Sequence, residues 1–229
     1  MTRTSSARVA GFTYLAYIAL AFPSMLLFDR AASGEGTAAR LASIAAHATD
    51  MRVAIVLTLI TGFAAIVLGV TLYAITREVD PDIAMAALAC RVGEGILAAI
   101  FLLTKLELLW LGTAAGPNAP DAKTALALGE LLFTGTRAWN IVISATFFAV
   151  GSTLFSWLLL RGRIIPVPLA WVGVVASALL VVCLPLQLAG LIGEPITSLM
   201  WLPMVAFEVP LGFWLLIKGA RAPARGQTV

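Results

Sequence analysis

The amino-acid sequence predicts an all-α fold, a polytopic transmembrane helix bundle with six spans. Hydrophobic residues make up 61% of the 229 residues and charged residues 12%, whereas roughly a quarter of an ordinary soluble domain is charged. The apolar residues also form long runs, and about 20 of them in a helix are enough to cross the hydrocarbon core. These observations predict a single transmembrane domain over 9–217, preceded by a cytoplasmic segment, 1–8, and followed by a disordered cytoplasmic tail, 218–229.

Three of the spans are predicted in the first half of the chain. The connection after the first span contains a stretch, 37–47, whose apolar residues have the spacing of a short amphipathic helix on the membrane surface. A charged turn with Pro81 separates the second span from the third, which is long enough to tilt in the bilayer. We therefore expect these spans at about 9–28, 51–75 and 83–112.

Glycine and proline divide the second half. A Gly- and Pro-rich stretch follows the third span, and Asp121 is a suitable N-cap for a helical stretch that reaches Phe133. A basic turn, 161–163, ends the fourth span, and prolines stand at the start of the fifth and just before the sixth. We expect these spans at about 137–160, 166–188 and 196–217.

The distribution of basic residues predicts the orientation. Four or five basic residues fall on one side of the predicted membrane, and the other side carries Arg3, Arg8, Arg77, Arg161, Arg163, Lys218, Arg221 and Arg225. Cytoplasmic connections are enriched in Lys and Arg. Both termini are therefore predicted to be cytoplasmic.

Ionisable side chains at membrane depth are the candidate functional residues. Arg91 and Glu94 lie far enough into the third span to be roughly 12 to 17 Å deep, and their i, i+3 spacing puts them on one helix face. Glu208 is at a similar depth in the sixth span, between Pro203 and Pro210, which favour kinks. A charge at such depth is costly unless it is paired or faces water. Arg91, Glu94 and Glu208 are therefore expected to meet at one level.

Lys105 extends the polar face of the third span. It follows Glu94 by eleven residues, which returns a helix to within about 20° of the same face. Such a stripe must face the interior of the bundle or a water-filled cavity, because lipid does not tolerate it. The hypothetical ligand-binding residues are Arg91, Glu94, Lys105 and Glu208.

Several classes of partner and chemistry are disfavoured. The basic residues are scattered at span ends instead of forming a patch, so no nucleic-acid partner is expected. His47 is the single histidine, and Cys90 and Cys183 lie inside apolar runs. No set of metal, haem or iron–sulfur ligands is therefore expected, and no cofactor.

Three short motifs carry a resemblance to a known family. They are Arg8-Val9-Ala10-Gly11 with Tyr14, Arg91 followed by Glu94, and Glu208 with Trp214-Leu215-Leu216-Ile217-Lys218-Gly219. Together they resemble the bacterial membrane family known as domain of unknown function 4386. The resemblance implies a six-span protein of the bacterial plasma (inner) membrane without assigned chemistry, and it makes Arg91, Glu94 and Glu208 the matching polar positions.

Three functional hypotheses remain open. The preferred one is a non-enzymatic membrane protein whose polar pocket, among the first, third and sixth spans, binds a small molecule or a lipid head group. The second is an intramembrane acid/base enzyme that uses Glu94 or Glu208, since burial can bring a carboxyl group toward neutrality. The third is a structural or accessory subunit whose buried charges only fix helix packing. In each case the lipid bilayer is a partner.

Overall fold

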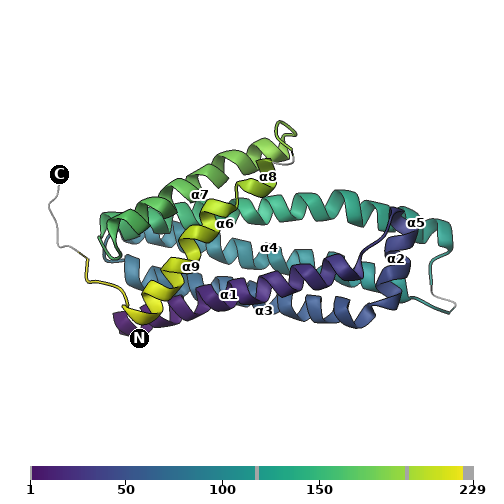
Figure 1. The fold of residues 1–229 in the computed structure, drawn as a ribbon, viewed down its shortest axis with the longest axis horizontal. Helices are drawn as coiled ribbons and strands as arrows, with labels where there is room; N and C mark the ends of the chain where they lie inside the picture. Colours follow the sequence, from purple (N-terminus) through teal and green to yellow (C-terminus); the bar gives the residue numbers. More distant parts are fainter. Residues whose placement is uncertain (1, 117–118, 194–195, 224–229) are drawn as a thin grey trace. The chain divides into compact units, whose positions relative to one another are not determined.

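The computed structural model describes residues 2–116, 119–193 and 196–223, and within these it describes only the backbone of 135–140. Helices account for most of this part of the chain, and it contains no strand (Figure 1). In chain order the elements are α1 (Arg3–Ala31), α2 (Gly36–Ala46), α3 (Ala48–Thr76), α4 (Pro81–Thr113), α5 (Ala122–Glu130), the π-helical segment η1 (Leu131–Thr136), α6 (Arg137–Arg161), α7 (Val167–Leu188), α8 (Ile196–Leu199) and α9 (Leu202–Ile217).

Six helical stretches in the described ranges are long and apolar enough to cross a membrane, which confirms the predicted fold class. They cover Arg3–Ala31, Ala48–Thr76, Pro81–Thr113, Ile141–Arg161, Val167–Leu188 and Ile196–Ile217. Long apolar runs fold this way because a helix satisfies all its backbone hydrogen bonds within one segment. The chain is therefore a multi-pass membrane protein.

The sixth span is interrupted. Its first turn, α8, ends at Leu199, and α9 begins at Leu202 with Pro203 in its first turn. A proline there costs little, since its missing N–H has no partner within the helix anyway. The interruption leaves Glu208 on the longer helix, α9.

The helices contribute to two compact units. Unit 1 consists of Met1–Tyr17, Phe63–Gly95 and Val142–Val229, and unit 2 of Ile18–Gly62 and Ile96–Ile141. Each unit has its own hydrophobic core.

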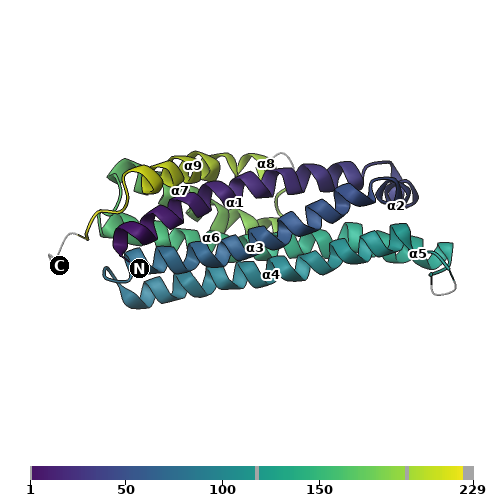
Figure 2. The same ribbon diagram turned by 90° about the horizontal axis from the view of Figure 1, so that it is seen from below.

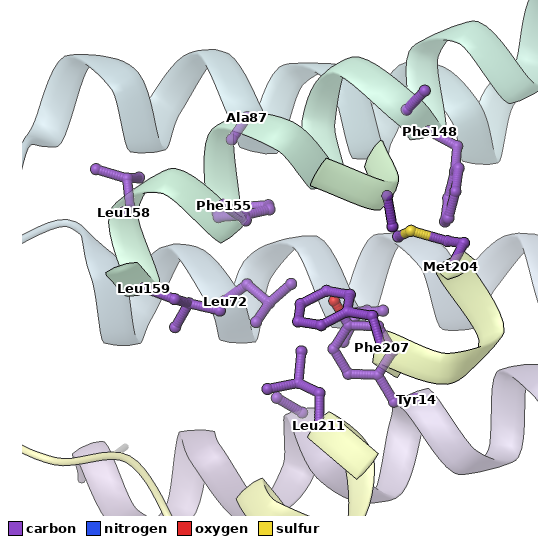
Figure 3. Packing of buried hydrophobic residues seen from close by; sticks show 14 of the residues in the cluster. Tyr14, Leu72, Ala87, Phe148, Phe155, Leu158, Leu159, Met204, Phe207 and Leu211 are labelled. Carbon is purple, nitrogen blue, oxygen red and sulfur yellow. The ribbon is translucent and has the colours of Figure 1, made fainter. Parts of the chain in front are cut away.

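The core of unit 1 is built by side chains from widely separated parts of the chain. Figure 3 shows Tyr14, Leu72, Phe155, Phe207 and Leu211 among the residues that converge there. Helices α7 and α9 pack against each other (Figures 1 and 2). They approach so closely at Gly173 that a Cβ atom there would overlap the ring of Phe207.

Arg3 and Arg221, near the two ends of the described residues, meet at one end of unit 1. Arg3 forms an ion pair with Glu78 at 2.6 Å, and its Nη1 also donates to the backbone oxygens of Ile75 and Arg221. The turn between α6 and α7 reaches the same group, since Arg161 forms an ion pair with Asp80 at 3.1 Å. One end of unit 1 therefore holds the start of α1, the end of α9, the turn between α3 and α4 and the turn between α6 and α7 (Figure 1).

Unit 2 packs the predicted amphipathic helix into its core. The helix forms as α2, with Leu41 and Ile44 buried, and it packs on α5. Ile44 lies against Gly112 of α4, while Thr37 and Leu41 lie against Gly129 of α5. Small residues at 112 and 129 therefore allow α2 to approach both helices.

The tail that the sequence predicts to be disordered falls only partly on described residues. The stretch 224–229 lies outside them. Within 218–223, the backbone N–H of Arg221 donates to the carbonyl of Ile164 at 3.0 Å. The described part of the tail is thus connected to the turn that precedes α7.

Candidate functional site

The candidate site in unit 1 is centred on an ion pair within α4. Nη1 of Arg91 lies 2.9 Å from Oε2 of Glu94, and the two residues are only 1% and 4% exposed. The pair forms because the i, i+3 spacing puts both side chains on the same face of the helix. The partnership that the sequence predicts between these two residues is present.

Tyr17 of α1 completes the environment of the Glu94 carboxylate. Its hydroxyl donates a hydrogen bond to Oε1 at 3.0 Å. The two carboxylate oxygens thus have different partners, a phenol on one and a guanidinium on the other. The hydroxyl of Ser144 donates to the backbone carbonyl of Glu94 at 3.4 Å, so α6 also contacts this turn of α4.

Small residues and aromatic rings enclose Arg91. A Cβ atom at Gly69 of α3 would lie 2.8 Å from Cβ of Arg91, and one at Gly151 of α6 would lie 3.3 Å from its Cδ. The guanidinium carbon lies 5.0 Å from the ring centroid of Phe148 and 5.8 Å from that of Tyr17. These distances are within the range of cation–π attraction.

The guanidinium of Arg91 has more donors than partners. Nε and Nη2 donate no hydrogen bond to any described residue, and neither does Nη1. The 2.9 Å contact of Nη1 with Glu94 is nevertheless an ion pair. We take it as an electrostatic contact whose hydrogen-bond direction is poor, because the direction of a hydrogen bond is stricter than the distance.

Glu208 presents a second carboxylate from α9. It is 6% exposed, and its Oε1 is buried without a hydrogen-bond partner among the described residues. It interacts electrostatically with Arg91, Glu94 and Tyr14. The structure therefore associates Arg91, Glu94 and Glu208 within unit 1. This cluster of three side chains is called the buried charge cluster below.

Lys105 belongs to unit 2 and has its own partners there. Its Nζ donates to Oγ1 of Thr58 at 2.7 Å and lies 3.4 Å from Oγ of Ser24. The rings of Phe28 and Phe101 lie 5.2 and 5.3 Å away. Hydroxyl oxygens and aromatic faces thus surround the ammonium group.

The described side chains do not form the donor set of a metal site. In the stretches for which side chains are described, no group of three or more His, Cys, Asp or Glu residues is close enough to hold a metal ion. The chemistry available to the buried charge cluster is therefore hydrogen bonding, charge pairing and proton exchange.

Sequence reasoning missed three contributors to the cluster. Tyr17 has the sequence context of an interfacial or packing aromatic residue, although its position three residues after Tyr14 puts both rings on one helix face. Gly69 and Gly151 are small residues that let neighbouring helices approach Arg91. The role of each of these residues depends on which residue of a neighbouring helix it contacts, and the sequence does not identify that residue.

A second polar group lies outside the six membrane-crossing stretches, in unit 2. Glu130 at the end of α5 accepts hydrogen bonds from the hydroxyls of Thr37 and Thr134. The bond from Thr37, and to a smaller extent that from Thr134, holds the pKa of the Glu130 carboxyl below its ordinary value. Arg137 follows Glu130 by seven residues, about two helical turns, and this spacing predicts that the two share a helix face. The side chain of Arg137 lies outside the described residues.

Comparison with known proteins gives one finding. No curated protein and no solved structure matches the chain. A family model with the description Domain of unknown function (DUF4386) matches residues 9–219, a range that contains Arg91, Glu94 and Glu208. The match confirms the resemblance suggested by the three sequence motifs, and the chain belongs to the DUF4386 family.

Proposed function

We propose that this membrane protein binds a small polar ligand, either a free molecule or a lipid head group, at the buried charge cluster. The observation that supports the proposal is the set of buried guanidinium N–H groups on Arg91 that have no acceptor among the described residues. A buried polar group without a partner costs about 1–3 kcal/mol, and more if it is charged. A ligand that accepts hydrogen bonds from Arg91 would remove this cost.

The cluster also limits the chemistry of the ligand. Arg91 offers donors at Nε and Nη2, and Glu208 offers an acceptor at Oε1. A matching ligand therefore carries an acceptor group, such as a carboxylate or phosphate, and a donor group. Glu94 and Tyr17 act as positioning residues, because their contacts orient the guanidinium without using its remaining donors.

A density map of the protein purified in native lipid tests the proposal, together with mass spectrometry of the molecules that co-purify. We expect non-protein density against Arg91 and Glu208 and one co-purifying species in stoichiometric amount. The species should be lost from Arg91→Met and retained by Glu107→Gln, which removes an exposed carboxylate from the same helix. A directly paired cluster without extra density, and no such species, would overturn the proposal and leave a purely structural role.

In this proposal the protein lies in the bacterial plasma membrane with both termini in the cytoplasm. The end of unit 1 where Arg3, Arg161 and Arg221 lie would face the cytoplasm, which agrees with the excess of basic residues there. The bacterial assignment is inferred from the sequence resemblance.

Labelling of single cysteines in spheroplasts tests this orientation. In a background without Cys90 and Cys183, a membrane-impermeant maleimide should modify Ser33→Cys in intact cells. It should modify Arg8→Cys only after permeabilisation. The reverse pattern would place the termini outside.

A further inference from the structure

The buried charges of unit 1 do not balance. Among its described side chains the buried charged residues are Arg91, Glu94 and Glu208, which is one cation and two acids. Desolvation makes an uncompensated charge at membrane depth unfavourable. Such a group ordinarily takes up a counter-charge or becomes neutral.

The neighbours of the two acids decide which of them is the anion. Glu94 has the guanidinium of Arg91 on one oxygen and accepts the hydroxyl proton of Tyr17 on the other. Both contacts favour the charged carboxylate. Glu208 has a buried oxygen that no described donor reaches.

The described groups around Glu208 supply no second cation. The titratable groups that interact with it are Tyr14 and Tyr17 of α1, and Arg91 and Glu94 of α4. Helix α7, which packs against α9, contains no acidic or basic residue, and Cys183 is its single titratable side chain. Arg91 is already opposed by Glu94, so its one positive charge does not neutralise both carboxylates.

We propose that Glu208 binds a proton, and that release of this proton changes the net charge of the buried charge cluster from 0 to −1. A proton can be bound by a single carboxylate oxygen and does not require a cavity. A metal cation in its place would need several oxygen ligands, and no such set gathers among the described residues. Glu208 is thus a hydrogen-ion binding site in the interior of unit 1, whether or not a larger ligand binds to Arg91.

Infrared difference spectroscopy of the full chain in lipid nanodiscs tests the proposal. At neutral pH we expect a protonated-carboxyl C=O band that shifts in D₂O and disappears at alkaline pH. The band should be absent from Glu208→Gln and should persist in Glu107→Gln. It should weaken in Glu94→Gln, because Arg91 is then left with Glu208 as its one buried acid and favours the ionised form. Wild-type and Glu208→Gln spectra that agree in this region would show an ionised Glu208 and overturn the proposal.

A second variant covers the case in which Glu208→Gln does not fold. Glu208→Asp keeps the carboxyl group but alters its surroundings, so the band should move in frequency. A band that stays in place in this variant belongs to another residue and overturns the assignment. These outcomes are separate from the search for ligand density, since a protonated Glu208 is expected with or without a ligand at Arg91.

Discussion

The hydroxyl of Tyr17 donates to Oε1 of Glu94 at 3.0 Å. This bond connects the first span to the third and satisfies the carboxylate oxygen that is not in the ion pair with Arg91. It joins residues that are 77 positions apart in the chain. The anionic state of Glu94 therefore depends on two helices.

Tyr17→Phe should destabilise the protein. The substitution keeps the ring but leaves a buried carboxylate oxygen without its donor, and a hydrogen bond to a charged group is worth about 1.5–3 kcal/mol. The free energy of unfolding, measured by SDS titration in mixed micelles, should fall by this amount. Tyr14→Phe is the comparison variant, since it removes a hydroxyl from the same helix while the Glu94 carboxylate keeps its bond to Tyr17. Equal stability of the two variants would contradict the role given to Tyr17.

Arg91→Met should be more harmful than the double variant Arg91→Met/Glu94→Gln. Removal of one partner of a buried ion pair leaves the other uncompensated and costs about 3–5 kcal/mol. Removal of the second charge should restore part of that loss. The same SDS titration measures both, and a double variant no more stable than the single one would show that Glu94 does not depend on Arg91.

Gly69→Ala should disturb the cluster through packing alone. The new Cβ atom would lie 2.8 Å from Cβ of Arg91, a position close to the backbone that side-chain rotation cannot relieve. Overpacking of this kind costs about 1–3 kcal/mol. Gly193→Ala is the control, because nothing lies within 4 Å of its Cβ position. Equal thermal unfolding midpoints for Gly69→Ala and Gly193→Ala would argue against close contact between α3 and α4 at Gly69.

Stability at acid pH should depend on Glu130. Its pKa is lowered in the folded protein, chiefly by the hydroxyl of Thr37. The contribution of Glu130 to folding stability is therefore fully present above the ordinary glutamate pKa of about 4.3. This contribution is lost as the pH falls through the lowered pKa of Glu130 in the folded protein. The thermal midpoint of Thr37→Val should fall less between neutral and acid pH than that of the wild type. The expected difference is small, since Glu130 is exposed.

The spans and the central ion pair follow from the sequence, because both depend on local spacing. Hydrophobic run length determines which segments can cross a bilayer, and an i, i+3 pair such as Arg91 and Glu94 lies on one helix face wherever the helix packs. The depth of Glu208 in the sixth span likewise indicated its association with this pair. The interruption at 200–201 was not predicted, although the prolines of this span suggested kinks.

Contacts between helices are what the sequence does not show. Lys105 has the angular position of Arg91 and Glu94 on one helix, yet its observed partners are hydroxyls of Ser24 and Thr58 in unit 2. The angular position of a residue gives the face of its own helix on which it lies. Its hydrogen-bond partners depend on which neighbouring helix lies opposite that turn. For the same reason, the position of Tyr17 in the first span does not reveal its hydrogen bond to Glu94 in the third.

The division of the chain between the units has a consequence for biogenesis. Unit 2 ends at Ile141, so its whole sequence leaves the ribosome before the last segment of unit 1, Val142–Val229, is made. Chains fold from the N-terminus during synthesis, so Tyr17, Arg91 and Glu94 can associate while Glu208 does not yet exist. The nascent protein thus carries a neutral ion pair first, and the second acid arrives only with α9.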